Sequence, residues 1–177
     1  FEPRDYQIDA LNETIQYGRQ LLLSPTASGK SLIIYLLARY YDKKTIIIVP
    51  TTSLVEQMAK DFEEYGYDKD VCKIYSGQPV FPADITISTW QSFAKAPKEV
   101  LQGFDVVVGD EAHLFKANVL KGILEKMKTT AIRIGTTGTL DGSEVHRLQL
   151  EGLFGPVKKV ITTKELMDEG TIANLNI

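Results

Sequence analysis

The sequence predicts an α/β fold in which a mainly parallel β-sheet lies between two layers of helices. Short β-branched runs such as Thr45–Val49 are apolar throughout, as expected of strands buried on both faces. Longer segments follow them in which apolar residues recur three or four positions apart, the spacing of an amphipathic helix. The two kinds of segment alternate along most of the chain, and this alternation is typical of a parallel sheet covered by helices.

Size and composition favour one globular domain, residues 1–177. The chain has 177 residues and is 44% apolar, with no repeat and no flexible linker. The single cysteine, Cys72, excludes an intrachain disulfide and fits a reducing cytoplasm. We see no secretion signal or membrane span, so we expect no membrane role. The net charge of −3 argues against a broad basic surface for nucleic acid, so any such contact must be local.

The first half of the chain contains the clearest elements. Residues 4–17 carry Ile8, Leu11 and Ile15 at helical spacing, and Gly18 ends this helix. The elements expected next are a strand at 20–23, a helix at 31–41, a strand at 45–49 and a helix at 53–65. The chain therefore begins with helix, strand, helix, strand, helix.

The second half has weaker signals. We expect strands at 71–75, 85–88, 106–108 and 131–135, and a helix at 119–127. Thr162 and Glu165 have the spacing of a capping box, and Gly170 supplies a stop, so a further helix is expected between them.

A candidate phosphate loop joins the first strand to the second helix. Residues 24–31 read SPTASGKS, although the strict phosphate-loop pattern has glycine where Ser24 stands. Such a loop turns backbone N–H groups toward phosphate oxygens at a helix N-terminus. Lys30 would reach the terminal phosphates and Ser31 would offer its hydroxyl to Mg²⁺. The alternative is an ordinary turn that enters a helix.

A pair of carboxylates follows the buried strand at 106–108. Residues 104–113 read FDVVVGDEAH, which places Asp110 and Glu111 at the carboxyl end of a strand, where open parallel sheets bind ligands. Asp110 is a candidate for holding Mg²⁺ and Glu111 for activating water, while His113 is a candidate for relaying the nucleotide state. Alternatively, Asp110 caps a helix and His113 lies in a solvated loop.

With both motifs placed, nearly the whole chain resembles superfamily 2 helicases, and within them the bacteriophage UvsW type of DNA helicase. RecG and restriction-enzyme motors are more distantly similar. The resemblance implies a RecA-like P-loop fold, ATP and Mg²⁺ as cofactors, and the DEAH form of the acidic motif at 110–113. In the usual PTGSGKT loop, glycine and threonine stand where this chain has Ala27 and Ser31. The residues implied to hold the phosphates are Pro25, Thr26, Ala27, Ser28, Gly29, Lys30 and Ser31.

Residues 1–7, FEPRDYQ, are similar to the adenine-recognition motif of this group. The resemblance implies that Gln7 hydrogen-bonds the adenine edge and that Arg4 supports it. The alternative is that these residues only begin a helix, with Gln7 facing solvent.

Two segments resemble the family's nucleic-acid contacts. In VPTTSLVEQ, residues 49–57, Thr51 and Thr52 are implied to face backbone phosphates. In STWQS, residues 88–92, Thr89 and Gln91 are implied to touch the nucleic acid, whereas we expect Trp90 in the core. The alternative for the first segment is a helix capped by Thr52 or by its neighbour Ser53.

Residues 135–140, GTTGTL, occupy the place of the motif that couples hydrolysis to movement. Thr137 and Thr139 are the implied coupling residues, with His113 as their neighbour. Residues 140–177 resemble the end of a first motor domain, and the family's second RecA-like domain is absent from this chain. Neither Arg133 nor Arg147 lies in a segment that resembles the arginine-finger motif of that second domain.

The sequence thus predicts the ATP-binding motor domain of an ATP-dependent DNA helicase or translocase. We expect the isolated domain to bind ATP and Mg²⁺ and to hydrolyse ATP weakly. We also expect it to contact the backbone of duplex or branched DNA. Three alternatives stay open: a nucleotide-switched nucleic-acid-binding module, the motor domain of a restriction-type DNA translocase, and a small-molecule phosphotransferase.

Overall fold

The structure of the chain is a computed structural model. The residues that it describes are 3–23, 29–75, 81–97, 99, 103–115, 117–127, 130, 132–138 and 144–159.

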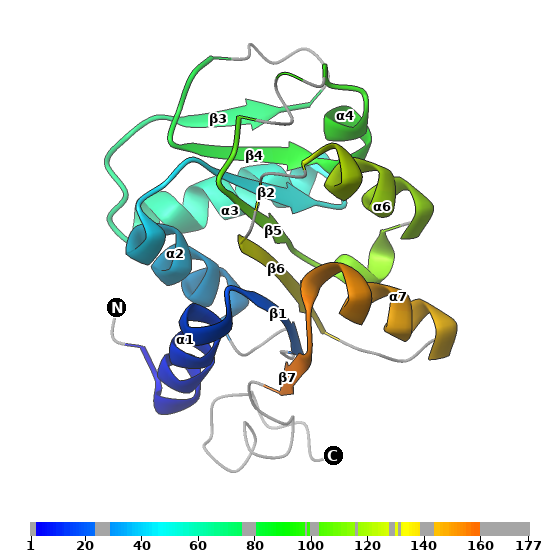
Figure 1. Cartoon of the computed structure of the whole chain (residues 1–177). Coiled ribbons are helices and arrows are strands. Elements are labelled where there is room, and N and C mark those ends of the chain that lie inside the picture. Colours follow the sequence, from blue (N-terminus) through cyan, green and yellow to red (C-terminus); the bar gives the residue numbers. More distant parts are fainter. Residues whose placement is uncertain are drawn as a thin grey trace, which may run out of the picture.

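A seven-stranded sheet forms the centre of the molecule, and every strand pairing in it is parallel (Figure 1). Its spatial order is β3-β4-β2-β5-β6-β1-β7. The strands in chain order are β1 (Arg19–Leu23), β2 (Thr45–Val49), β3 (Val71–Ile74), β4 (Ile85–Thr89), β5 (Val106–Gly109), β6 (Ile132–Thr137) and β7 (Val157–Lys159). Every residue of β2 and β5 is buried, as their apolar runs predicted, and so is every residue of β4, which was expected as a weaker strand.

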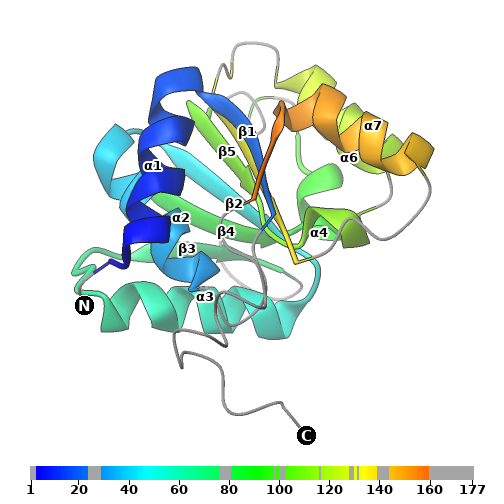
Figure 2. The same cartoon turned by 90° about the horizontal axis from the view of Figure 1, so that it is seen from below.

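Helices cover both faces of the sheet (Figures 1 and 2). One face carries α1 (Asp5–Tyr17), α2 (Lys30–Tyr41) and α3 (Thr52–Glu64), and the other carries α4 (Trp90–Ala94), α6 (Ala117–Lys126) and α7 (Glu144–Phe154). Each layer has its own apolar core: Ile34 and Phe62 belong to the first, and Phe93 and Phe154 to the second. The predicted α/β fold with a parallel sheet between helices is confirmed.

The ends of the first helices follow local backbone chemistry. Gly18 has a φ of 71°, and its N–H bonds the carbonyl of Thr14, so it ends α1 as predicted. Thr51 caps α3, because its hydroxyl accepts a hydrogen bond from the N–H of Leu54 at 3.2 Å. The sequence alternative had placed this cap on Thr52 or Ser53, which is wrong by one or two residues.

Among the described residues, four elements were not predicted: the helices α4 and α7, the strand β7 and the 3₁₀ turn η2 (Ala112–Leu114). The five residues of α4 and the three of β7 are too few for periodicity to be visible. The helix predicted between Thr162 and Gly170 lies outside the described residues. No helix in the described part of the chain is long and apolar enough to span a membrane.

Candidate active site

The predicted nucleotide motifs follow strands that lie close together in the sheet, although they are far apart in sequence. β6 lies between β1, which leads to the phosphate loop, and β5, which leads to the acidic pair. The register pairs Gly109 with Gly135, and Leu23 with Thr137. Since all three strands are parallel, their carboxyl ends open on one edge of the sheet. This edge holds the candidate site.

Lys30, at the start of α2, points at the acidic pair. Its ammonium forms an ion pair with Glu111, and it lies 3.8 Å from Oδ1 of Asp110. The side chains of Lys30 and Asp110 are 10% and 8% exposed. Burial lowers the pKa of Lys30, and the negative charge of Asp110 opposes this shift. These contacts join the start of α2 to the two residues that follow β5.

Asp110 is held in place from β6. Thr136 donates its hydroxyl hydrogen to Oδ1 of Asp110 at 2.6 Å, and the same oxygen accepts the N–H of Glu111 at 3.1 Å. Both Asp110 and Thr136 are buried. Glu111, with a φ of 54°, precedes the turn η2, so the helix-cap alternative for Asp110 is wrong. The sequence did not single out Thr136, because nothing local shows that β6 adjoins β5.

A second set of contacts extends from Glu111 through His113 to β6. His113 Nε2 lies 3.6 Å from Oε2 of Glu111, and its Nδ1 lies 2.6 Å from the hydroxyl of Thr137. The imidazole is therefore engaged on both sides, in contrast to the solvated loop residue of the alternative. The structure brings together His113 and Thr137, as the coupling prediction requires. Thr139 lies outside the described residues.

Gln7 connects the start of α1 to the phosphate loop. Its Nε2 donates to the carbonyl of Gly29 at 3.2 Å, and its Oε1 accepts the backbone N–H of Arg4 at 2.8 Å. Gln7 is 3% exposed, so the alternative that it faces solvent is wrong. Gly29 has a φ of 75°, a conformation that favours glycine, and a Cβ there would collide with Nε2 of Gln7.

The side chain of Arg4 lies against the same helix start. Its guanidinium donates to the hydroxyl of Tyr6 at 2.7 Å and lies 5.9 Å from the centroid of that ring. Arg4 thus contacts Tyr6 through its side chain and Gln7 through its backbone N–H. The remaining predicted loop residues, Pro25, Thr26, Ala27 and Ser28, lie outside the described residues.

Ser31, in the first turn of α2, makes a contact that the sequence did not suggest. Its Oγ lies 2.6 Å from the hydroxyl of Tyr65, which follows α3. Burial raises the pKa of Tyr65, while the hydrogen bond with Ser31 opposes that shift. Among the described residues, no cluster of three His, Cys, Asp or Glu side chains could hold a metal by itself. A metal bound here would depend on oxygens of a ligand as well as on Ser31 and Asp110.

The predicted nucleic-acid residues share the neighbouring part of the same edge. β2 and β4 are adjacent and in register, with Val49 opposite Thr89. The residues that follow these strands therefore lie close together. Thr51, Thr52 and Gln91 are exposed, whereas Thr89 is buried and accepts the N–H of Ser92 at 3.3 Å to cap α4.

Trp90 packs against the core cluster beneath α4 and lies 6.4 Å from the ring of Phe115. It is partly rather than fully buried, so its expected place in the core is confirmed in part.

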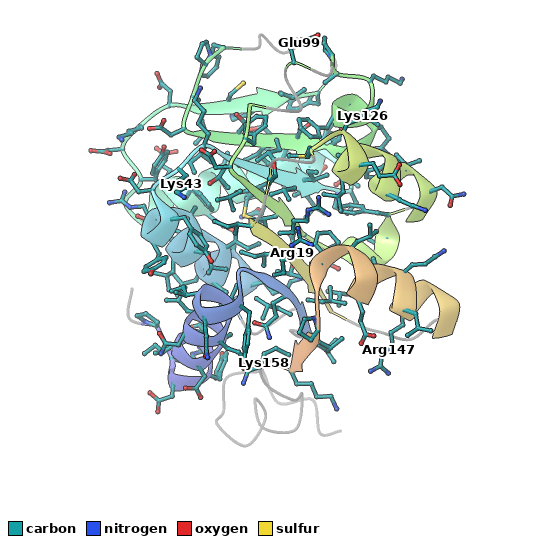
Figure 3. The ribbon with its side chains drawn as sticks, viewed as in Figure 1. Arg19, Lys43, Glu99, Lys126, Arg147 and Lys158 are labelled. Atoms are coloured by element: carbon teal, nitrogen blue, oxygen red, sulfur yellow. The ribbon has the colours of Figure 1, made fainter. Side chains whose placement is uncertain are left out.

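The two late arginines have contacts of their own. Arg133 on β6 donates to the carbonyls of Thr130 and Leu124, each at 3.3 Å. Arg147 lies on α7, half exposed, 3.4 Å from Glu151 (Figure 3). Neither lies against the carboxylates of the site.

Comparison with known proteins agrees with this geometry. Residues 1–142 match the family model described as "Type III restriction enzyme, res subunit". The chain belongs to this family. The predicted membership of superfamily 2 and the RecA-like helicase fold are confirmed with it.

Relatives from phage and archaea cover nearly the whole chain. The chain is 36% identical to "ATP-dependent DNA helicase uvsW" of Enterobacteria phage T4 over 99% of its length. It is 26% identical to "DNA 3'-5' translocase XPB2" of Sulfurisphaera tokodaii over 93% of its length. A crystal structure of T4 UvsW matches 93% of the chain with a TM-score of 0.84 and 36% identity, and the chain covers 36% of that structure. The chain spans 37% of the length of both curated relatives. The two curated relatives are thus named as a DNA helicase and a DNA translocase, and the chain is similar to one part of each.

Proposed function

We propose that this chain is the nucleotide-binding RecA-like half of an ATP-dependent DNA helicase or translocase. The observation that supports this most is the meeting of Lys30 with Asp110 and Glu111 at the carboxyl edge of the sheet. A phosphate-binding cation beside two carboxylates is what phosphoryl transfer from a nucleotide requires. The names of the phage T4 and Sulfurisphaera relatives, a DNA helicase and a DNA translocase, point to the same reaction.

The nucleotide would be held from three sides. Backbone N–H groups of residues 26–29 and the N-terminus of α2 would bind its phosphates together with Lys30. Gln7, supported by Arg4, would hydrogen-bond the adenine. Ser31 and Asp110 offer the hard oxygen ligands that Mg²⁺ prefers, and nucleotide phosphates complete such sites. When bound, Mg²⁺ neutralises charge on the phosphates.

The protein side chains then have separate roles. Lys30 would leave Glu111 for the terminal phosphates, and Glu111 would accept a proton from the attacking water. Thr136 would keep Asp110 oriented. His113, in contact with both Glu111 and Thr137, would convey the state of the nucleotide to β6, and Thr139 would extend that connection.

DNA would bind at the neighbouring part of the edge, beyond β2 and β4. The exposed hydroxyl and amide groups of Thr51, Thr52 and Gln91 can hydrogen-bond phosphate oxygens without a basic surface, whereas the buried Thr89 caps α4 beside them. This agrees with a chain of net charge −3. We propose that the substrate is duplex or branched DNA and that the protein contacts the DNA backbone. The proposed site of action is the cytoplasm, or the host cytoplasm if a phage encodes the protein.

A second RecA-like domain would complete the motor. In such enzymes an arginine supplied to the transferring phosphoryl group accelerates hydrolysis by roughly 10³ to 10⁵. Arg133 and Arg147 are engaged elsewhere in this chain. The isolated chain should therefore bind ATP with Mg²⁺ and hydrolyse it slowly, and a second domain should restore turnover that DNA stimulates.

The experiment is to measure ADP affinity and ATP turnover of this chain with and without duplex and forked DNA. Lys30→Ala should lower ADP affinity by roughly 10-fold or more, since a charge-assisted bond to phosphate is lost. Glu111→Gln should keep ADP affinity and remove turnover. Lys121→Ala is the matched control, because Lys121 is an exposed lysine on α6 whose ion pair is with Glu125 of the same helix. Equal ADP affinity in the unsubstituted chain and the Lys30→Ala variant would contradict the proposal.

The family description favours a second candidate, the motor of a restriction-type DNA translocase. The two differ in what the complete motor does to DNA. Separation of the strands of a forked duplex supports a helicase, whereas displacement of a third strand without separation of the duplex supports a translocase.

A further inference from the structure

The hydroxyl of Tyr65 lies against the residue that the proposed function assigns to Mg²⁺. Ser31 follows Lys30 in the first turn of α2, and its Oγ is 2.6 Å from the Tyr65 hydroxyl. This is a typical length for an O–H···O hydrogen bond. The two residues are 34 positions apart and come from different helices, so the contact exists only in the folded chain.

Two further contacts hold Tyr65 in position. The backbone N–H of Tyr65 donates to the carbonyl of Asp61 at 2.9 Å, and this bond anchors the residue to the end of α3. Its ring lies 5.3 Å from the ring of Tyr35. Tyr35 is one turn beyond Ser31 on α2, so ring and hydroxyl both face the same side of that helix. Tyr65 is thus held against α2 by its ring as well as by its hydroxyl.

A serine hydroxyl has one hydrogen to donate and two lone pairs to offer. When a lone pair binds a cation, the hydrogen must point to an acceptor elsewhere, and such outer partners orient the groups that bind metals. We propose that Tyr65 is a positioning residue that accepts the hydroxyl hydrogen of Ser31 and turns the serine lone pairs toward the Mg²⁺ of the bound nucleotide. This inference rests on the proposed function, since it assumes that Mg-nucleotide binds beside Lys30.

The test compares ADP affinity with Mg²⁺ and ADP affinity in the presence of a chelator, in the unsubstituted chain and in Tyr65→Phe. The variant keeps the ring that packs on Tyr35 and removes only the hydroxyl. The enhancement of ADP affinity by Mg²⁺ should fall about 3- to 10-fold, the usual effect of one hydrogen bond. Affinity for metal-free ADP should stay unchanged, because Tyr65 acts only on the metal ligand. Calorimetry measures both affinities without any turnover.

Two further variants separate positioning from packing. Tyr67→Phe is the matched control, because the buried Tyr67 hydroxyl has no hydrogen-bond partner among the described residues and its ring packs on Phe62 near the same helix end. It should leave the Mg²⁺ enhancement intact. In a Ser31→Ala background, Tyr65→Phe should cause no additional loss, because the group that it orients is already gone.

The outcomes are distinct. The inference is supported if Tyr65→Phe reduces the enhancement of ADP affinity by Mg²⁺, Tyr67→Phe does not reduce it, and Tyr65→Phe adds no further loss to Ser31→Ala. An unchanged enhancement overturns it, and so does a larger one, because the hydroxyl would then compete with Mg²⁺ for Ser31. Failure of the unsubstituted chain to bind ADP overturns the proposed function together with the inference. ADP binding that Lys30→Ala weakens, combined with an enhancement that Tyr65→Phe leaves alone, overturns the inference only.

Discussion

Thr136 donates its hydroxyl hydrogen to the carboxylate of Asp110 across 2.6 Å, between two adjacent strands. The pairing of Gly109 with Gly135 explains this contact, since Asp110 follows Gly109 at the end of β5 and Thr136 follows Gly135 within β6. Both side chains are buried, so Asp110 has little access to water as an alternative donor. The orientation of the proposed Mg²⁺ ligand thus depends on a strand that is remote from it in sequence.

Replacing this threonine should destabilise the chain and disturb the site. Thr136→Val keeps the volume and removes the donor, and hydrogen bonds to charged groups contribute about 1.5–3 kcal/mol. We expect the free energy of unfolding to fall by about that amount, measured by urea denaturation. We also expect weaker binding of Mg-ADP. Thr136→Ser is the control, because it retains the hydroxyl. A Thr136→Val variant as stable as the unsubstituted chain would show that the bond contributes nothing.

The hydrogen bonds of Gln7 lead to a second prediction. Its Nε2 donates to the carbonyl of Gly29, and its Oε1 accepts the N–H of Arg4. Gln7→Ala loses both bonds. Gln7→Glu retains an acceptor for Arg4 but turns a carboxylate oxygen toward the carbonyl of Gly29, where two acceptors repel. We therefore expect ADP affinity to fall in both variants. The affinity of Gln7→Glu should be roughly tenfold lower than that of Gln7→Ala, since a repulsion of about 1.4 kcal/mol corresponds to a factor of ten.

The measurement is ADP affinity by calorimetry for the three proteins, with GDP as the second ligand. If Gln7 also contacts adenine, the preference for ADP over GDP should shrink in Gln7→Ala. Equal ADP affinity in the Glu and Ala variants would show that the contact with Gly29 does not hold the phosphate loop.

Local pattern was sufficient to predict the layers of this fold. The β-branched run of β2 and the helical spacing of Ile8, Leu11 and Ile15 depend only on residues near in sequence. The spatial strand order β3-β4-β2-β5-β6-β1-β7 depends on which strands pair, and no local pattern encodes that. The helix α7 was not predicted either, although it lies within residues 140–177, which resemble the end of a first motor domain.

The residues of the candidate site also fall into those that local motifs predict and those that depend on the packing of distant elements. Lys30, Asp110 and Glu111 belong to contiguous motifs, so their residue types and spacing were sufficient to find them. Thr136 and Tyr65 contact partners 26 and 34 residues away, and the roles proposed for them depend on the pairing of β5 with β6 and on the packing of α2 against α3.

The close packing of Gly135 beneath α7 leads to a third prediction. A Cβ on Gly135 would lie 2.9 Å from Leu21 and from the ring of Phe154, closer than real Cβ contacts allow. Both neighbours are fully buried in the second core, so neither has room to move. Gly135→Ala should lower the free energy of unfolding by about 1–3 kcal/mol, the usual effect of overpacking. Phe154→Leu should recover part of the loss in that background.

The control is Gly122→Ala on α6, where an added Cβ meets nothing within 4 Å. Alanine there should increase stability by about 0.5–1 kcal/mol, because glycine is unfavourable inside a helix. Thermal and urea denaturation of both variants measure the contrast. Equal effects of the two substitutions would mean that Phe154 does not restrict Gly135.

The last prediction concerns acid and the edge strand β7, which pairs only with β1 among the described strands. Lys158 on β7, labelled in Figure 3, lies 2.8 Å from Oε2 of Glu13 on α1, and Gln20 donates to Oε1 of Glu13 at 3.1 Å. The hydrogen bond from Lys158, followed by that from Gln20, lowers the pKa of Glu13 below its usual value of 4.5. A carboxyl whose pKa is lower in the folded than in the unfolded state stabilises the fold above the unfolded pKa. That contribution is lost as the pH falls from about 4.5 through the folded value.

Glu13→Gln should therefore lower the free energy of unfolding at pH 7 and make it decline less steeply below pH 4.5. The side chains of Lys158 and Glu13 are 29% and 34% exposed, so the difference at pH 7 should be a few tenths of a kcal/mol and should shrink in about 1 M salt. Glu125→Gln is the control, because Glu125 is 63% exposed and lies 3.9 Å from Lys121 on the same helix. It should leave the acid limb of the stability curve unchanged. If the free energy of unfolding declined equally steeply below pH 4.5 in Glu13→Gln and in the unsubstituted chain, the ion pair would not stabilise the contact between β7 and α1.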